Sequence, residues 1–162
     1  MSKYNHPIKA VIFDNDGVII DSIPIYLQVF KEIVGFDYPQ SLLKKISGRS
    51  DREICRIAVE DLNLPMTADE FFEKRQEGLA KKFPESPLIP GADKIVHKLK
   101  QIGLPLALAT SGNRAGQILK ATNHKELYSL FDVIICGDEV KEAKPSPEIF
   151  LTAAQKLGNI KP

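Results

Sequence analysis

The stretch that decides the fold is IKAVIFDNDGV, residues 8–18, in which a short apolar run ends at two carboxylates. Residues 8–13 are rich in β-branched side chains, as is typical of a buried parallel strand. Asp14 and Asp16 directly follow this run, and Gly17 marks a tight turn after them. The sequence therefore predicts a buried strand that delivers two carboxylates to one end of a sheet.

The next part of the chain, residues 22–83, has no strand signal. We expect a helix capped by Ser22 and further helices over 41–46, 51–62 and 67–83, the last of them opened by a capping box at Thr67 and Glu70. Further strands are predicted at 104–109 and 133–136, with helices between and after them. Strands that alternate with helices predict a three-layer α/β core with a parallel sheet. We expect core segments at 1–21 and 84–162, and a small all-helical cap at 22–83.

Polar residues also follow the second and third predicted strands. Thr110, Ser111 and Gly112 come directly after the second strand, and Lys144 lies in the loop after the third. Because the carboxyl ends of parallel strands meet at one rim, we expect these residues to lie close to the two carboxylates of the first strand. The sequence thus predicts one polar site that is built from three strand ends.

These residue types suit phosphoryl transfer. A carboxylate such as Asp14 can attack phosphorus, and a second one, Asp16, can give and take the proton. Two carboxylates also suit Mg²⁺, which prefers one or two carboxylates together with substrate phosphate. The hydroxyls of Thr110 and Ser111 and the turn at Gly112 can cradle phosphate oxygens. An ammonium group near this cradle would stabilise the transferred charge.

Three motifs carry a resemblance to a known family. FDNDGV at 13–18 resembles the first motif of the haloacid dehalogenase superfamily of phosphatases, and ATSG at 109–112 resembles the second. KPSPEIF at 144–150 resembles the third, and the predicted helical cap stands where that superfamily carries a small cap. Finer stretches, such as PGADK at 90–94 and HKE at 124–126, are similar to the pseudouridine-5'-phosphatase-like branch, with the β-phosphoglucomutase branch close by.

The resemblance implies a role for each residue of the core site. Asp14 would be the nucleophile and a metal ligand, and Asp16 the general acid and base and a metal ligand through its backbone carbonyl. Ser111, with Thr110 and Gly112 beside it, would hold the phosphoryl oxygens. Lys144 would join them there, and Mg²⁺ is the implied cofactor.

The resemblance also implies a role for the cap. Gly48, Arg49 and Ser50 match the cap loop that reaches down to the leaving group of the substrate. The superfamily's fourth motif, an acidic pair on another strand, does not occur before Pro162, so we expect a chain truncated before that motif, with the first strand at a sheet edge. Three functions stay open: a phosphatase, a phosphomutase, or a truncated protein of weak or no activity.

The overall composition limits the classes of partner that we expect. The chain has 162 residues, a net charge of +1 and no apolar run near the length of a membrane span, so we expect no nucleic-acid or membrane partner. The two cysteines, Cys55 and Cys136, are far apart and outside any CxxC pair, which favours reduced thiols and a cytoplasmic location. We expect a monomer that acts on a small phosphorylated metabolite.

Overall fold

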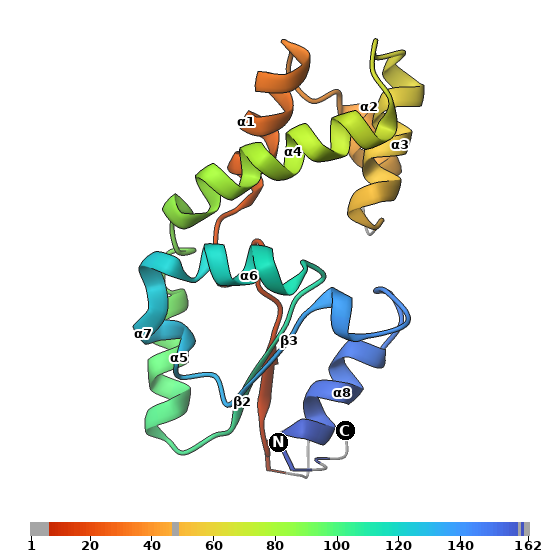
Figure 1. The fold of residues 1–162 in the computed structure, drawn as a ribbon. Coiled ribbons are helices and arrows are strands. Elements are labelled where there is room, and N and C mark those ends of the chain that lie inside the picture. The colour runs from red at the N-terminus through yellow and green to blue at the C-terminus, as the bar shows by residue number, and fades with distance from the viewer. Residues whose placement is uncertain (1–6, 47–48, 159, 161–162) are drawn as a thin grey trace.

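The computed structural model describes residues 7–46, 49–158 and 160 (Figure 1). The strands are β1 (Val11–Phe13), β2 (Leu106–Ala109) and β3 (Val133–Ile135). The α-helices are α1 (Ile23–Val34), α2 (Gln40–Ile46), α3 (Asp51–Leu62), α4 (Ala68–Lys82), α5 (Ala92–Gln101), α6 (Arg114–Lys120), α7 (Lys125–Tyr128) and α8 (Glu148–Lys156). Short 3₁₀ turns are η1 (Phe83–Glu85), η2 (Thr122–His124) and η3 (Gly137–Glu139).

The sheet is parallel, with the order β1-β2-β3. Val11 pairs with Leu106, and Ala107 pairs with Val133. The parallel α/β prediction is confirmed, and β1 lies at an edge of the sheet, as expected. The first strand is shorter than the predicted span of 8–13, because Ile8 is 71% exposed and lies outside the paired region.

The side chains on the two faces of β2 pack in two different apolar clusters, because successive side chains of a strand point to opposite faces. Leu106 and Leu108 pack with α5 and α7 on one face. Ala107 and Ala109 pack on the other face against α8. Figure 1 shows α5 and α7 on one side of the sheet and α8 on the other, which gives the expected three layers.

The cap is built from α1, α2, α3 and α4. Its core is a separate apolar cluster around Phe30, Leu42, Cys55 and Phe71, contributed by these four helices. Between residues 22 and 83, the described residues form no strand, in agreement with the sequence pattern. In Figure 1 these helices stand above the sheet, at the end where the strands deliver their polar residues.

The helix ends explain where the cap elements begin and end. Thr67 and Glu70 form the predicted capping box at the start of α4, and α1 ends at Gly35, whose φ of 85° is the left-handed conformation that glycine adopts easily. The role predicted for Ser22 was wrong. Ser22 stands at the N-cap position of α1, but its side chain makes no capping hydrogen bond, because it donates to Asp16 instead.

The chain enters and leaves the cap along two neighbouring segments. The Asp21 N–H donates to the Pro87 carbonyl at 2.8 Å, and Ile20 forms a bridge with Leu88. This pairing joins the two connections close to the rim of the sheet, so the cap is anchored beside the first strand. No helix in the part of the chain that the structure describes is both long enough and apolar enough to cross a membrane.

Candidate active site

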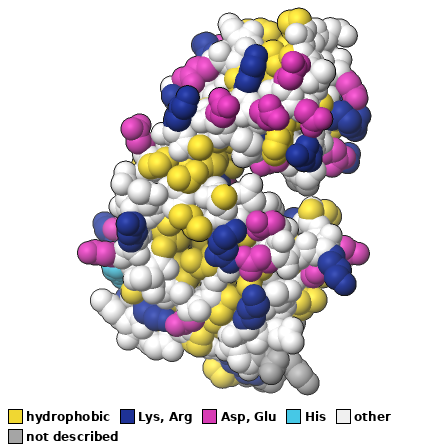
Figure 2. Space-filling view, in the orientation of Figure 1, with side chains coloured by type: hydrophobic (Ala, Val, Ile, Leu, Met, Phe, Trp, Pro, Cys, Tyr) yellow, Lys and Arg dark blue, Asp and Glu magenta, His cyan; other side chains and the backbone are white. Residues whose placement is uncertain are grey.

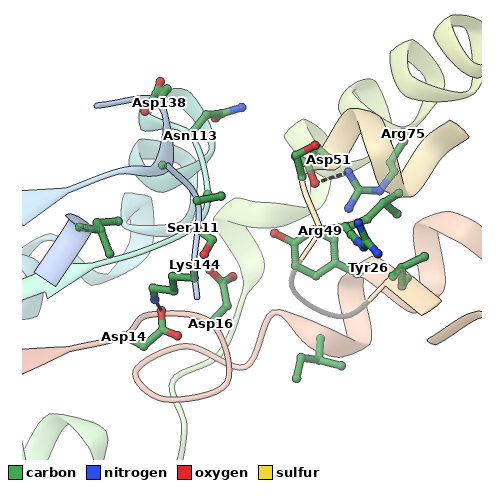
Figure 3. Close-up of a pocket in the computed structure, with 18 of the residues that line it drawn as sticks. Asp14, Asp16, Tyr26, Arg49, Asp51, Arg75, Ser111, Asn113, Asp138 and Lys144 are labelled. Atoms are coloured by element: carbon green, nitrogen blue, oxygen red, sulfur yellow. Dashed lines mark hydrogen bonds and ion pairs between the residues drawn. The ribbon is translucent and has the colours of Figure 1, made fainter. Parts of the chain in front are cut away.

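A cavity of about 640 Å³ lies between the cap and the carboxyl ends of the strands. Figure 2 shows the corresponding notch between the upper and lower parts of the molecule. From the core, the predicted residues Asp14, Asp16, Ser111, Gly112 and Lys144 all line it. The three strand ends therefore meet at one site, as the sequence pattern predicted (Figure 3).

Asp14 lies at the end of β1 and contacts a cation. Its Oδ1 lies 3.0 Å from the Lys144 Nζ and also accepts a hydrogen bond from the Asn15 N–H at 2.7 Å. Lys144 is held in turn, because its Nζ donates to the Ala109 carbonyl at the end of β2 at 3.0 Å. The Asp14 side chain is 43% exposed. A charged carboxylate is thus fixed by an ammonium and still open to the cavity.

Asp16 is held more tightly than Asp14. Its Oδ1 accepts from the Ser22 hydroxyl at 2.5 Å and from the Lys120 ammonium, and its Oδ2 accepts from the Thr110 hydroxyl at 3.1 Å. Burial alone would raise the pKa of the Asp16 carboxyl, but the Lys120 charge and the three hydrogen bonds outweigh it and lower that pKa below its usual value. Asp16 is therefore a positioned carboxylate in the resting arrangement.

The predicted phosphate cradle divides into two groups. Ser111 is exposed and lines the cavity. Thr110 is fully buried and does not line the cavity. Its hydroxyl donates to Asp16 and accepts from the Gly112 N–H at 3.1 Å. Of the backbone N–H groups in this turn, that of Gly112 is already bonded to the Thr110 hydroxyl. Thr110 therefore holds Asp16 from outside the cavity, whereas Ser111 faces the cavity.

A buried hydrogen-bond network supports the loop that carries both carboxylates. The Asn15 Nδ2 donates to the Gln117 Oε1 at 2.9 Å, and the Tyr128 hydroxyl donates to the Asn15 Oδ1 at 2.7 Å. Asn15 is fully buried, and its own carbonyl accepts from the N–H groups of the turn that follows. The loop is therefore fixed on the side opposite the cavity, so that Asp14 and Asp16 have defined positions.

The cap contributes a mainly apolar lining with a few charges. Arg49 lines the cavity and pairs with Glu53 at 2.9 Å, and Ser50 lines it while its hydroxyl caps α3. Gly48, the third predicted residue of the cap loop, lies outside the described residues. Asp51 and Arg75 form an ion pair at 2.9 Å at the cap side of the cavity (Figure 3).

The donor set suits a hard cation. The Asp14 Oδ2 accepts no hydrogen bond from any residue in the described ranges, and no backbone N–H within those ranges donates to the Asp16 carbonyl. A carboxylate oxygen and a carbonyl oxygen are the ligands that Mg²⁺ prefers, alongside phosphate and water. The residues present therefore fit the predicted Mg²⁺.

Sequence reasoning did not single out Lys120 or Tyr26 as residues of the site. On α6 the usual pattern is inverted: Gln117 and Lys120 are 3% and 2% exposed, whereas Ile118 is 61% exposed. The Lys120 Nζ reaches Asp16 and also donates to the Tyr26 hydroxyl at 3.0 Å. The available signal was the spacing of Gln117 and Lys120, which are three residues apart and therefore share a helix face.

Comparisons with known proteins agree with this arrangement. The family model for haloacid dehalogenase-like hydrolases matches residues 11–162. The chain is 35% identical over 159 residues to (DL)-glycerol-3-phosphatase 1 of Arabidopsis thaliana, covering 93% of this chain and 53% of the plant protein. It is 32% identical over 163 residues to a protein of Drosophila melanogaster named "probable pseudouridine-5'-phosphatase", covering 97% of this chain and 71% of the fly protein.

A solved structure shows the same fold. The crystal structure of β-phosphoglucomutase from Clostridium difficile matches with a TM-score of 0.75 at 25% identity, over 93% of this chain and 71% of the enzyme. The chain spans about half the length of the plant phosphatase. The parallel α/β core is the one expected from the sequence, and the chain belongs to the haloacid dehalogenase-like hydrolases.

Proposed function

We propose that this chain is a Mg²⁺-dependent phosphomonoesterase that removes phosphate from a small organic phosphate. The observation that carries the proposal is the meeting of Asp14, Lys144 and Asp16 in one cavity, with Lys144 3.0 Å from the Asp14 carboxylate. A nucleophile, a cation for the transferred charge, and a second carboxylate for proton transfer are the groups that such a reaction needs.

The reaction has two halves. In the first, Asp16 accepts a proton from the monoanionic phosphate group as the substrate binds. An Asp14 oxygen then forms a bond to phosphorus, the bond from phosphorus to the leaving oxygen breaks, and that oxygen takes the proton from Asp16. In the second, Asp16 accepts a proton from water and the water oxygen forms a bond to phosphorus. The bond from phosphorus to the Asp14 oxygen breaks, which releases inorganic phosphate and regenerates the Asp14 carboxylate. Splitting one difficult step into two in this way is the advantage of covalent catalysis.

The other groups hold the phosphoryl oxygens and exclude water. The Ser111 hydroxyl and the Lys144 ammonium face the cavity beside Asp14 and provide donors for these oxygens. Bound Mg²⁺, held by the Asp14 carboxylate and the Asp16 carbonyl, would neutralise negative charge between the nucleophile and the phosphate. The cap covers the same cavity, so that water is displaced during the first half-reaction.

The cavity suits a small phosphate whose leaving group contacts the cap. Apolar side chains of the cap and the charged pair Asp51–Arg75 face the space beyond the carboxylates. The similar proteins named above are phosphatases of small metabolites, which supports a nucleotide-like or sugar phosphate as the substrate class. Arg49 and Ser50 are the cap residues that we propose contact the leaving group.

Phosphate release from a panel of sugar phosphates, nucleoside monophosphates and glycerol phosphate tests this proposal. We expect release that requires Mg²⁺, stops on addition of a chelator, and returns when Mg²⁺ is restored. Asp14→Asn should abolish release while leaving the circular dichroism spectrum unchanged. Asp93→Asn is the matched control, because Asp93 is an exposed carboxylate in the first turn of α5, away from the cavity.

The covalent step has its own readout. Mass spectrometry of the protein with substrate should detect one added phosphoryl group on Asp14, and Asp14→Asn should prevent it. Asp16→Asn should slow the second half-reaction, because no base remains to activate water. A folded chain that releases no phosphate from any member of the panel with Mg²⁺ would refute the phosphatase proposal.

A phosphomutase is the second candidate, and it is favoured by the likeness to β-phosphoglucomutase. The first half-reaction is the same, but the phosphoryl group passes from Asp14 to a sugar hydroxyl instead of water. Chromatography of the products separates the two activities. Conversion of one sugar phosphate into its isomer, dependent on a bisphosphate activator and with little free phosphate, would favour the mutase.

A further inference from the structure

Lys120 is a buried cation that the reaction described above does not use. Its side chain is 2% exposed, on α6, which follows the second motif. Burying an ammonium group is costly unless it is paired and hydrogen-bonded. Lys120 is both, because it contacts Asp16 and donates to the Tyr26 hydroxyl at 3.0 Å. Packing alone does not explain why a charged side chain is buried at this position.

The ammonium group has partners on both sides of the cavity. Asp16 belongs to the core, whereas Tyr26 belongs to the cap helix α1. The ring of Phe83, at the point where the chain leaves the cap, lies 4.5 Å from the Lys120 Nζ. A cation over an aromatic face is attracted to it. Lys120 is therefore held in place by groups other than Asp16, and can act on Asp16 as a fixed support.

The carboxyl group of Asp16 is surrounded by three supports from different parts of the chain. Ser22 and Lys120 both donate to Oδ1, and Thr110 donates to Oδ2. Of the three, only Lys120 carries a charge, and a charge-assisted hydrogen bond is about twice as strong as a neutral one. Without Lys120, the Asp16 side chain would keep only hydroxyl partners and a wider choice of rotamers.

We propose that Lys120 is a positioning residue that fixes the Asp16 carboxyl group for proton transfer to the leaving oxygen of the substrate. This inference rests on the proposed phosphatase function. A misplacement of a proton donor by about 1 Å can cost about a hundredfold in rate. The effect falls on the step in which the leaving oxygen needs a proton, and not on the binding of the phosphate, which uses Ser111 and Lys144.

The dependence on the leaving group distinguishes this role from a structural one. An alkyl phosphate has a poor leaving group that needs a proton from Asp16, whereas p-nitrophenolate departs readily without one. Lys120→Met keeps the length of the side chain and removes its charge. The second half-reaction is the same for both substrates, so the first is measured by itself, as the rate of phosphorylation of Asp14 in a single turnover. We expect this rate to fall about 10- to 100-fold with an alkyl phosphate and less than about threefold with p-nitrophenyl phosphate.

Lys100→Met is the matched control, because Lys100 forms an ion pair with Asp132 away from the cavity. It should leave both rates unchanged. If Lys120→Met does not fold, Tyr26→Phe decides the matter: it removes only the hydroxyl that accepts from Lys120, and a smaller loss confined to the alkyl phosphate is expected. An equal loss on both substrates, or no loss on either, would overturn the positioning role in either variant.

The activity of the unmodified chain distinguishes a failure of the proposed phosphatase function from a failure of the positioning role of Lys120. If it hydrolyses neither p-nitrophenyl phosphate nor any alkyl phosphate of the panel with Mg²⁺, the proposed function fails, and the role of Lys120 fails with it. If it hydrolyses both and the variants show no selectivity, only the role of Lys120 fails. A selective loss on the alkyl phosphate supports both.

Discussion

The Lys144 ammonium lies 3.0 Å from the Asp14 carboxylate and donates to the Ala109 carbonyl, also at 3.0 Å. Because Ala109 is the last residue of the central strand, this carbonyl has a fixed position in the sheet. The ring of Phe150 lies 4.9 Å from the same ammonium group and limits its movement. The cation beside the proposed nucleophile is therefore preorganised, which is the condition under which electrostatic catalysis is strong.

Lys144→Met should lower kcat for any substrate that the chain hydrolyses by about 100- to 1,000-fold, the usual effect of removing one preorganised donor. Phosphate release under saturating substrate and Mg²⁺ measures it. Lys141→Met is the control, because Lys141 is three residues away but exposed and outside the cavity lining. If the two variants had equal activity, Lys144 would not be part of the site.

The core of the site could be predicted from the sequence because its residues sit at fixed offsets from strand ends. Asp14 and Asp16 follow β1 directly, and parallel strands bring such positions to one rim without knowledge of the side-chain contacts. Lys144 lies nine residues after Ile135, the last residue of β3. The prediction that it belongs to the site therefore depended on the third motif and not on spacing alone.

The supports of Asp16 could not be predicted in the same way. Lys120 looks like a solvated helix lysine until the cap brings Tyr26 and Phe83 close to it. Ser22 reads as a helix cap from the sequence, but the nearness of Asp16 gives its hydroxyl a different partner. In each case the deciding contact joins residues whose proximity depends on how the cap sits on the core, and no local pattern encodes that.

The ion pair between Asp51 and Arg75 should stabilise the cap. Arg75 is 8% exposed, so Asp51→Ala would leave a buried guanidinium without its charged partner. We expect the free energy of unfolding to fall by about 1–3 kcal/mol in urea denaturation. KM should rise as well, because both residues line the cavity.

Glu60→Ala is the comparison for that variant. It removes one partner of the Arg56–Glu60 pair, whose side chains are 54% and 59% exposed. Exposed pairs on one helix contribute about 0.3–0.5 kcal/mol, so the effect should be small and KM should not change. Equal losses in the two variants would show that the burial of Arg75 adds nothing.

Gly137 packs so closely under the second motif that no side chain fits there. A Cβ at this position would lie 2.3 Å from the Ser111 carbonyl oxygen, and the Gly137 N–H donates to the Gly112 carbonyl at 2.8 Å. Gly137→Ala should therefore push the Ser111 loop away from Asp14. We expect a loss of about 1–3 kcal/mol in stability and at least a tenfold loss of kcat.

Gly103→Ala separates the two effects. Gly103 has a φ of 82° but open space around its Cβ position, so alanine there costs about 1 kcal/mol of backbone strain without touching the site. Thermal unfolding and phosphate release measured side by side should show reduced stability for both variants and reduced activity for Gly137→Ala alone. Full activity in Gly137→Ala would contradict the close contact with Ser111.

Asp132 should make the core sensitive to acid. Hydrogen bonds from the Lys100 ammonium at 2.6 Å and from the Leu106 N–H at 2.9 Å lower the pKa of the Asp132 carboxyl below its usual value. A group whose pKa is lower in the folded state contributes stability above its unfolded-state pKa, and loses it as the pH falls through the folded-state pKa. Because the Asp132 side chain is 44% exposed, solvent screens its ion pair, and Asp132→Asn should lower the free energy of unfolding by no more than about 1 kcal/mol at pH 7.

The difference between Asp132→Asn and the unmodified chain should shrink below about pH 4 and vanish once Asp132 is protonated in the folded state as well, because asparagine resembles the neutral acid. Urea denaturation at a series of pH values measures it. Asp37→Asn is the control, since the Asp37 side chain is 83% exposed and should change stability by less than about 0.5 kcal/mol at any pH. A constant difference for Asp132→Asn from pH 7 to the lowest pH at which the chain folds would show that its two hydrogen bonds do not depend on the charge.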